Sequence, residues 1–235
     1  MAGAAKKGAE FLVNTTTVGN QFHASVATLA GGGFVILWED LAATGTNIRS
    51  RIYNAAGAAI ASDFIVYDGP DYSQAPAVAA LGAGFVATWA APDSPSPRSV
   101  FAGTFNATGA AILPGAEIAP GTVLDRNPQI ASSTAGGYLA VWDDVGQTAA
   151  DGDGKAVLGS ISGGATLTFN ATTAGNQTTP AVAALLGGSG NYVVTYVSSN
   201  PANTQHDLEA RIIAANGSPV GGEISIATGF TPDFG

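Results

Sequence analysis

The chain has 235 residues, of which 46% are hydrophobic and only 11% are charged, and it contains no cysteine. This composition excludes an intrinsically disordered chain, which needs low hydrophobicity with dense charge, and a small disulfide-stabilised scaffold. The net charge is −9 and the 8 basic residues are spread along the chain, so no basic stripe is available to bind nucleic acid.

The first part of the chain contains five short segments of β type, separated by polar turns. In chain order they are residues 10–15, 24–29, 33–38, 51–57 and 64–66. The second and third are apolar and are joined by a Gly-rich turn, which predicts a pair of antiparallel strands. The fourth ends in a turn in which glycine supplies the positive φ that a tight connection requires.

The same segments recur along the whole chain. Their clearest marker is a terminal aromatic residue at positions 38, 89, 142 and 196, which are 51, 53 and 54 residues apart. The later copies of the four strand segments are residues 76–81, 84–89, 103–109 and 117–119; then 128–132, 137–142, 159–163 and 167–169; and finally 180–185, 191–196, 211–217 and 223–226. Four short strands in each unit of about 50 residues is the pattern of a β-propeller blade.

We therefore predict an all-β, propeller-like fold with four repeats of about 50 residues and four antiparallel strands in each. Four blades would close a compact ring. No window has the helical spacing of apolar residues, so no helix is predicted. Residues 1–9 are predicted to be a flexible N-terminal tail and residues 10–235 a single domain. Within that domain the repeats are approximately 10–62, 63–115, 116–164 and 165–222, followed by a surplus strand at 223–235.

The surplus arises because the segment that ends each unit occurs five times, whereas every other segment occurs four times. Residues 10–15 open the chain with one copy, and residues 223–228 lie near its end with another. Three alternatives stay open. One end pairs as an extra edge strand, or it docks on another subunit by strand addition, or the chain is a piece of a larger array.

Residues 11–38, and to a lesser degree 167–196, resemble the tandem G-G-F-V-x-x-W repeats of large secreted proteobacterial proteins of the RTX and adhesin type. The resemblance implies an extracellular or bacterial cell-surface location, reached without an N-terminal signal peptide, which is not seen here. It also implies a role in surface structure, adhesion or carbohydrate contact. The chain departs from the pattern in its third unit, which lacks the Asn-Thr-Thr entry, and in its fourth, which has Tyr196 in place of Trp.

The repeated aromatic residues are candidates for ligand binding. Trp38, Trp89, Trp142 and Tyr196 occupy equivalent strand ends, and a ring of aromatic side chains offers stacking faces to sugars. The alternative is that they fill the space between blades. Glu39 and Asp40 directly follow the first of them, as Asp143 and Asp144 follow the third, so acidic groups line one rim of the predicted ring. Such a rim suits hydrogen bonding to sugar hydroxyls, or is a solvated edge.

A cluster of four acidic residues suggests a calcium site. Asp143, Asp144, Asp151 and Asp153 lie close together in the sequence, and 151–154 resembles the start of a calcium loop. The next ligand position holds Lys155 and no later bidentate Glu follows, so a solvated acidic loop is the alternative. Calcium is thus the candidate cofactor, and no cofactor is certain.

The sequence predicts no catalytic residue. His23 and His206 are the only histidines and lie in non-equivalent positions, and thiol chemistry is excluded by the absence of cysteine. Glycoside hydrolysis needs two carboxyl groups at a defined separation, which a sequence does not establish. We therefore predict that the chain is not an enzyme, and we keep glycoside hydrolysis as a third hypothesis.

The leading functional hypothesis is a non-enzymatic extracellular or surface module, structural or adhesive, that self-assembles through its surplus edge strand. Its partners would be copies of itself or other surface proteins. The alternative is a lectin-like, carbohydrate-binding propeller that contacts glycans through the loops after the repeated aromatics. The apolar runs are of strand length, which argues against membrane insertion.

Overall fold

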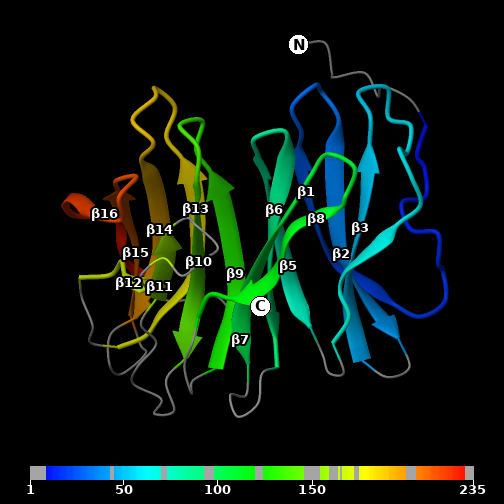
Figure 1. Ribbon diagram of the computed structural model, residues 1–235. Helices are drawn as coiled ribbons and strands as arrows, with labels where there is room; N and C mark the ends of the chain where they lie inside the picture. The colour runs from blue at the N-terminus through cyan, green and yellow to red at the C-terminus, as the bar shows by residue number, and fades with distance from the viewer. Residues whose placement is uncertain are drawn as a thin grey trace, which may run out of the picture.

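A computed structural model describes residues 9–42, 45–69, 73–92, 98–119, 124–145, 154–158, 164, 166–171, 175–199 and 205–230. These residues form sixteen strands in four antiparallel sheets, each built from four consecutive strands. Figure 1 shows the sheets side by side in chain order, from blue and cyan to orange and red. The described residues contain no helix, and hence none that could span a membrane. The predicted all-β propeller fold with four blades is confirmed.

The four blades have the following strands. Blade 1 contains β1 (Gln21–Thr28), β2 (Phe34–Ala42), β3 (Gly45–Tyr53) and β4 (Phe64–Tyr67). Blade 2 contains β5 (Gln74–Leu81), β6 (Gly84–Ala91), β7 (Ser99–Phe105) and β8 (Ala111–Glu117). Blade 3 contains β9 (Leu124–Ser132), β10 (Tyr138–Val145), β11 (Gly154–Leu158) and β12 (Thr166–Thr168). Blade 4 contains β13 (Gln177–Ala184), β14 (Tyr192–Ser199), β15 (His206–Ile213) and β16 (Pro219–Phe230).

The first strand of each blade is innermost, and the neighbours β1, β5, β9 and β13 pack in that order. Three apolar cores lie between successive blades. The first joins blade 1 to blade 2 around Trp89, the second joins blade 2 to blade 3 around Trp142, and the third joins blade 3 to blade 4 around Tyr196. Burial of apolar side chains in these seams supplies the main stabilisation, because the second strand of each blade carries apolar residues on both faces.

The expected closed ring is not seen. No core of the described residues joins blade 4 to blade 1, and the outward faces of both end blades are exposed. Val26 on β1 is 64% exposed and Ile226 on β16 is 52% exposed. The four blades therefore form an open arc with three complete seams.

The fifth copy of the blade-ending segment is the N-terminal one. Residues 223–228 lie within β16, which pairs with β15 and completes blade 4. Residues 10–15 form no strand, and lie against blade 1, where the Val13 carbonyl accepts hydrogen bonds from the Arg51 guanidinium and the Tyr53 hydroxyl. In blade 4, Arg211 makes the equivalent bond to the carbonyl of Phe169, just after β12. The N-terminal segment thus contacts blade 1 as the end of blade 3 contacts blade 4. The predicted tail, residues 1–9, lies outside the described residues except for residue 9.

Candidate functional site

The inner strands carry an irregularity at the same place in all four blades. His23, Ala75, Asn127 and Thr179 have φ values of 47°, 51°, 51° and 53°. Left-handed backbone is unusual for residues other than glycine, and it costs free energy unless the surroundings impose it. The strand register also shifts beside these residues, as expected for β-bulges. The bulges re-aim four side chains toward a common space.

That space is a cavity of about 420 Å³ to which all four inner strands contribute, and we call it the axial cavity. Its wall includes the four bulge residues and four further residues with hydrogen-bonding or ring-shaped side chains, Ser25, Pro76, Gln129 and Pro180. The lining residues used below are His23, Ser25, Ala75, Pro76, Asn127, Gln129 and Thr179. Hydroxyl, amide and imidazole groups thus converge on one opening at the centre of the propeller.

Two buried carboxylates fix the bulges from behind. Glu39 Oε1 lies 2.9 Å from His23 Nδ1 and accepts a 2.5 Å hydrogen bond from the backbone amide of Ala75. Asp143 accepts a 2.7 Å bond from the Asn127 side-chain amide and a 2.7 Å bond from the backbone amide of Thr179. Each carboxylate therefore binds the bulge side chain of its own blade and the bulge backbone of the next blade.

Burial dominates the electrostatics of Asp143. It raises the pKa of this carboxyl group, and the bonds from Asn127 and Thr179, together with the nearby Arg126, offset the increase only in part. Glu39 is buried as well, but His23, which it holds, has a side chain that is 69% exposed. In the tautomer whose Nδ1–H donates to this carboxylate, Nε2 is left for another partner.

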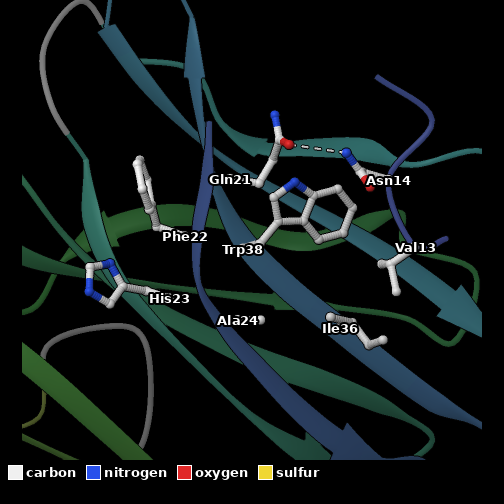
Figure 2. A pocket seen from close by; sticks show the side chains of 8 residues that line it. All are labelled: Val13, Asn14, Gln21, Phe22, His23, Ala24, Ile36 and Trp38. Atoms are coloured by element: carbon white, nitrogen blue, oxygen red, sulfur yellow. Dashed lines mark hydrogen bonds between the residues drawn. The ribbon is translucent and has the colours of Figure 1, made fainter. Parts of the chain in front are cut away.

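A second cavity of about 250 Å³ opens on blade 1 and shares His23 with the axial cavity. Figure 2 shows Trp38 at its centre, with Gln21 and Asn14 on one side, Ile36 and Val13 beside it, and Phe22 and His23 across from them. Both polar atoms of the Gln21 side-chain amide are hydrogen-bonded. Its nitrogen donates to Asp40 at 3.0 Å, and its oxygen accepts from the Asn14 side-chain amide at 3.2 Å. We call this the blade-1 cavity.

The structure brings together part of the predicted site. Trp38 lines the blade-1 cavity, Glu39 holds His23 and Asp40 holds Gln21. The two acidic residues are therefore buried and orient residues of the cavity wall, and they do not form the solvated rim that was expected.

The other predicted aromatics are placed differently. Trp89, Trp142 and Tyr196 are enclosed in the three seams, where none presents an open stacking face, and the Tyr196 hydroxyl donates to Glu223. Trp38 is also buried, with 4% of its surface exposed, but it belongs to none of the three seam cores and lines the blade-1 cavity instead.

Two of the four predicted calcium ligands, Asp143 and Asp144, lie among the described residues. Asp143 and Asp144 are buried, and Asp143 is engaged by Asn127, Thr179 and Arg126. Asp151 and Asp153 lie outside the described residues. Among the residues that the structure does describe, no group of three acidic, histidine or cysteine side chains is arranged to hold a metal ion.

The sequence reasoning missed the lining residues His23, Asn127, Gln129 and Thr179. The available signal was positional, since His23, Ala75, Asn127 and Thr179 are 52 residues apart. Polar side chains at two further copies of the position held by His23 would have indicated a shared polar centre.

No family model matches the chain, and no curated protein does. Solved structures do. An endo-arabinase from Bacteroides thetaiotaomicron matches with a TM-score of 0.52 and 10% identity, over 83% of this chain and 76% of that one. A GH93 α-L-arabinofuranosidase of Fusarium graminearum, solved with arabinobiose, matches with a TM-score of 0.59 and 12% identity, over 90% of this chain and 68% of that one. An ulvan lyase of family PL25 matches with a TM-score of 0.60 and 8% identity, over 87% of this chain and 55% of that one.

These matches correct two expectations from the sequence. A non-enzymatic structural or adhesive module, and the statement that the chain is not an enzyme, are both contradicted, because the solved structures it resembles are carbohydrate-active enzymes. The comparison agrees better with the alternative, a carbohydrate-binding propeller. At such low identity the similarity establishes the fold, and the fold is that of a β-propeller.

Proposed function

We propose that this chain is a carbohydrate-active propeller whose glycan site is formed by the axial cavity and the adjoining blade-1 cavity. The observation that carries the proposal is His23, which is exposed on the wall of both cavities and held through Nδ1 by the buried carboxylate of Glu39. Sugars present many hydroxyl groups, and imidazole, amide and hydroxyl side chains on a shaped wall are suited to bind them.

The composition of the two cavities supports this proposal. The axial cavity offers Asn127, Gln129 and Ser25 as hydrogen-bonding groups, whereas the blade-1 cavity adds the aromatic side chains of Phe22 and Trp38. An aromatic face beside polar groups is a common arrangement for holding a sugar ring. The structural neighbours include proteins described as bound to arabinobiose and to an ulvan fragment, which guides the choice of ligands to test.

Cleavage of the bound glycan is a second candidate function, favoured by the Glu39–His23 pair. A carboxylate that fixes the Nδ1 proton orients the imidazole and leaves Nε2 able to accept a proton, as a general base does. The extracellular or surface location implied by the repeat resemblance is part of the same proposal, since polysaccharide substrates lie outside the cell.

Titration calorimetry tests the binding proposal with arabino-oligosaccharides, ulvan fragments and sialylated oligosaccharides. We expect saturable binding of at least one of these classes, and we expect His23→Ala and Gln129→Ala each to weaken it about fivefold to fiftyfold, as loss of a hydrogen bond does. Thr134→Ala, in an exposed turn between β9 and β10, serves as the matched control and should bind as the parent does.

The same ligands serve for activity assays, in which release of reducing ends reports hydrolysis and ultraviolet absorbance of an unsaturated product reports lyase action. The cleavage candidate predicts activity that His23→Ala abolishes. The proposal that the axial cavity binds glycan would be overturned if none of the three ligand classes bound, or if His23→Ala and Gln129→Ala both bound as tightly as the parent.

A further inference from the structure

The three seams contain an equivalent side-chain pair with a different chemical composition in each. One member is the aromatic residue at or next to the start of a blade's second strand. The other lies at the end of the inner strand of the preceding blade, either as its last residue or directly after it, and this position repeats every 52 residues. Phe85 faces Leu29 in the first seam, so both members are apolar. Tyr192 faces Ser133 in the third seam, and its hydroxyl hydrogen-bonds this serine.

The second seam has a mismatched pair. Tyr138 meets Leu81, and among the described residues the Tyr138 hydroxyl has no hydrogen-bond partner although the residue is 1% exposed. Burial raises the pKa of Tyr138 to about 12, so the hydroxyl stays protonated at neutral pH and is able to donate. A buried donor without an acceptor costs folding free energy, and such a group calls for a partner.

A cavity of about 690 Å³ lies at this seam, and Tyr138 and Leu81 are both part of its wall. Phe85, Phe105, Ile112 and Leu113 make most of the rest apolar, and no lining residue carries a charge. Ile112 is 63% exposed at the mouth. Glycines at 82, 136 and 137 keep the opening free, since a Cβ at any of them would meet no atom within 4 Å. The wall thus combines a broad apolar surface with three hydrogen-bonding side chains, Thr104, Asn106 and Tyr138, and of these only the buried Tyr138 hydroxyl is recorded without a partner among the described residues.

We propose that the cavity between blades 2 and 3 binds a small, neutral, mostly apolar molecule whose one hydrogen-bond acceptor pairs with the Tyr138 hydroxyl. This site is separate from the glycan site, because the two cavities share no lining residue. A charged ligand is disfavoured, since no opposite charge lines the wall to offset its desolvation. The acceptor of the ligand pairs with the Tyr138 hydroxyl as Ser133 pairs with the Tyr192 hydroxyl.

The probe for this site is a neutral naphthyl ketone dye, 6-propionyl-2-dimethylaminonaphthalene, whose carbonyl is an acceptor and whose emission shifts to the blue in apolar surroundings. We expect saturable binding of one dye per chain. Two variants repair the mismatch from opposite sides, Tyr138→Phe to match the Phe85 seam and Leu81→Ser to match the Tyr192 seam. Each should bind the dye about fivefold to tenfold more weakly.

Without dye, Tyr138→Phe should unfold at a temperature no lower than the parent, because it loses no hydrogen bond present in the structure. Tyr192→Phe is the matched control, since it removes a hydroxyl that already has a partner. It should lower the unfolding temperature and leave dye binding unchanged. The absence of saturable binding, which is expected if water alone satisfies the hydroxyl, would overturn the proposal. So would equal dye affinity in Tyr138→Phe and the parent.

Discussion

The side chain of Asp143 in blade 3 accepts a 2.7 Å hydrogen bond from the backbone amide of Thr179 in blade 4. Glu39 and Ala75 repeat this relationship between blades 1 and 2. Blade 2 has Ala90 at the corresponding position and cannot make the bond to blade 3. Carboxylate clamps therefore support two of the three seams in addition to apolar packing, and both clamps also orient a side chain of the axial cavity.

Removing one clamp should destabilise the protein substantially. Asp143→Ala leaves the Thr179 amide and the Asn127 side-chain amide without their acceptor, and we expect the free energy of unfolding to fall by about 2–4 kcal/mol. Asn127→Ala removes one of these bonds and keeps the other, so it should cost less. Urea denaturation at pH 7 measures both. Equal losses for the two variants would show that the bond to the next blade contributes little.

Asp143 should also make stability depend on pH in a particular direction. Burial raises its pKa in the folded state above the ordinary value of 3.8, so the folded protein retains this proton to higher pH than the unfolded chain. Its contribution to stability is complete below the ordinary pKa and is lost as the pH rises through the folded-state pKa. We expect the stability of the parent relative to Asp143→Asn to decrease from pH 3.8 toward neutrality, as measured by urea denaturation across this range. An increase over the same range would contradict the assignment.

Much of the fold could be predicted because the aromatic-ended strands repeat in phase with the blades. The periodic apolar strands at 33–38 and their copies determine where each sheet lies, and the structure places them as β2, β6, β10 and β14. The site was harder to predict because it depends on bulges at Ala75 and Thr179, residue types that give no local sign of a left-handed backbone. The burial of Glu39 could not be predicted either, because the amide that it binds, that of Ala75, belongs to the next blade.

The sequence pattern indicated five blade-ending segments, whereas the structure has four strands of this type and residues 10–15 form none. Residues 223–228 pair with β15 and residues 10–15 contact Arg51, and neither partner can be identified from spacing alone. The open seam between blades 4 and 1 was likewise hidden, because apolar residues such as Val26 have the same pattern whether or not a neighbour covers them.

Close backbone approach at the hairpins predicts a large effect of a small change. A Cβ on Gly84 would lie 1.9 Å from the carbonyl oxygen of Phe105, in the neighbouring strand. Gly84→Ala therefore forces β6 and β7 apart, and we expect a loss of about 2–4 kcal/mol in the free energy of unfolding. Gly222→Ala is the matched control, since a Cβ there meets nothing within 4 Å, and it should change stability by less than about 0.5 kcal/mol. Thermal unfolding of the two variants makes the comparison, and similar melting temperatures would contradict it.

The repeated tryptophans should separate into structural and binding roles when each is replaced by alanine. Trp89 is completely enclosed between blades 1 and 2, so Trp89→Ala should cost about 3–5 kcal/mol of stability. Trp38 has the same place in its repeat, but one side of it lines the blade-1 cavity. Replacing it with alanine therefore removes fewer contacts with other protein atoms. Trp38→Ala should therefore cost less stability than Trp89→Ala and should weaken glycan binding. Urea denaturation and titration calorimetry on the same preparations test both halves. If Trp38→Ala instead destabilises as much as Trp89→Ala and binds glycan normally, Trp38 serves packing alone and the blade-1 cavity is not part of the glycan site.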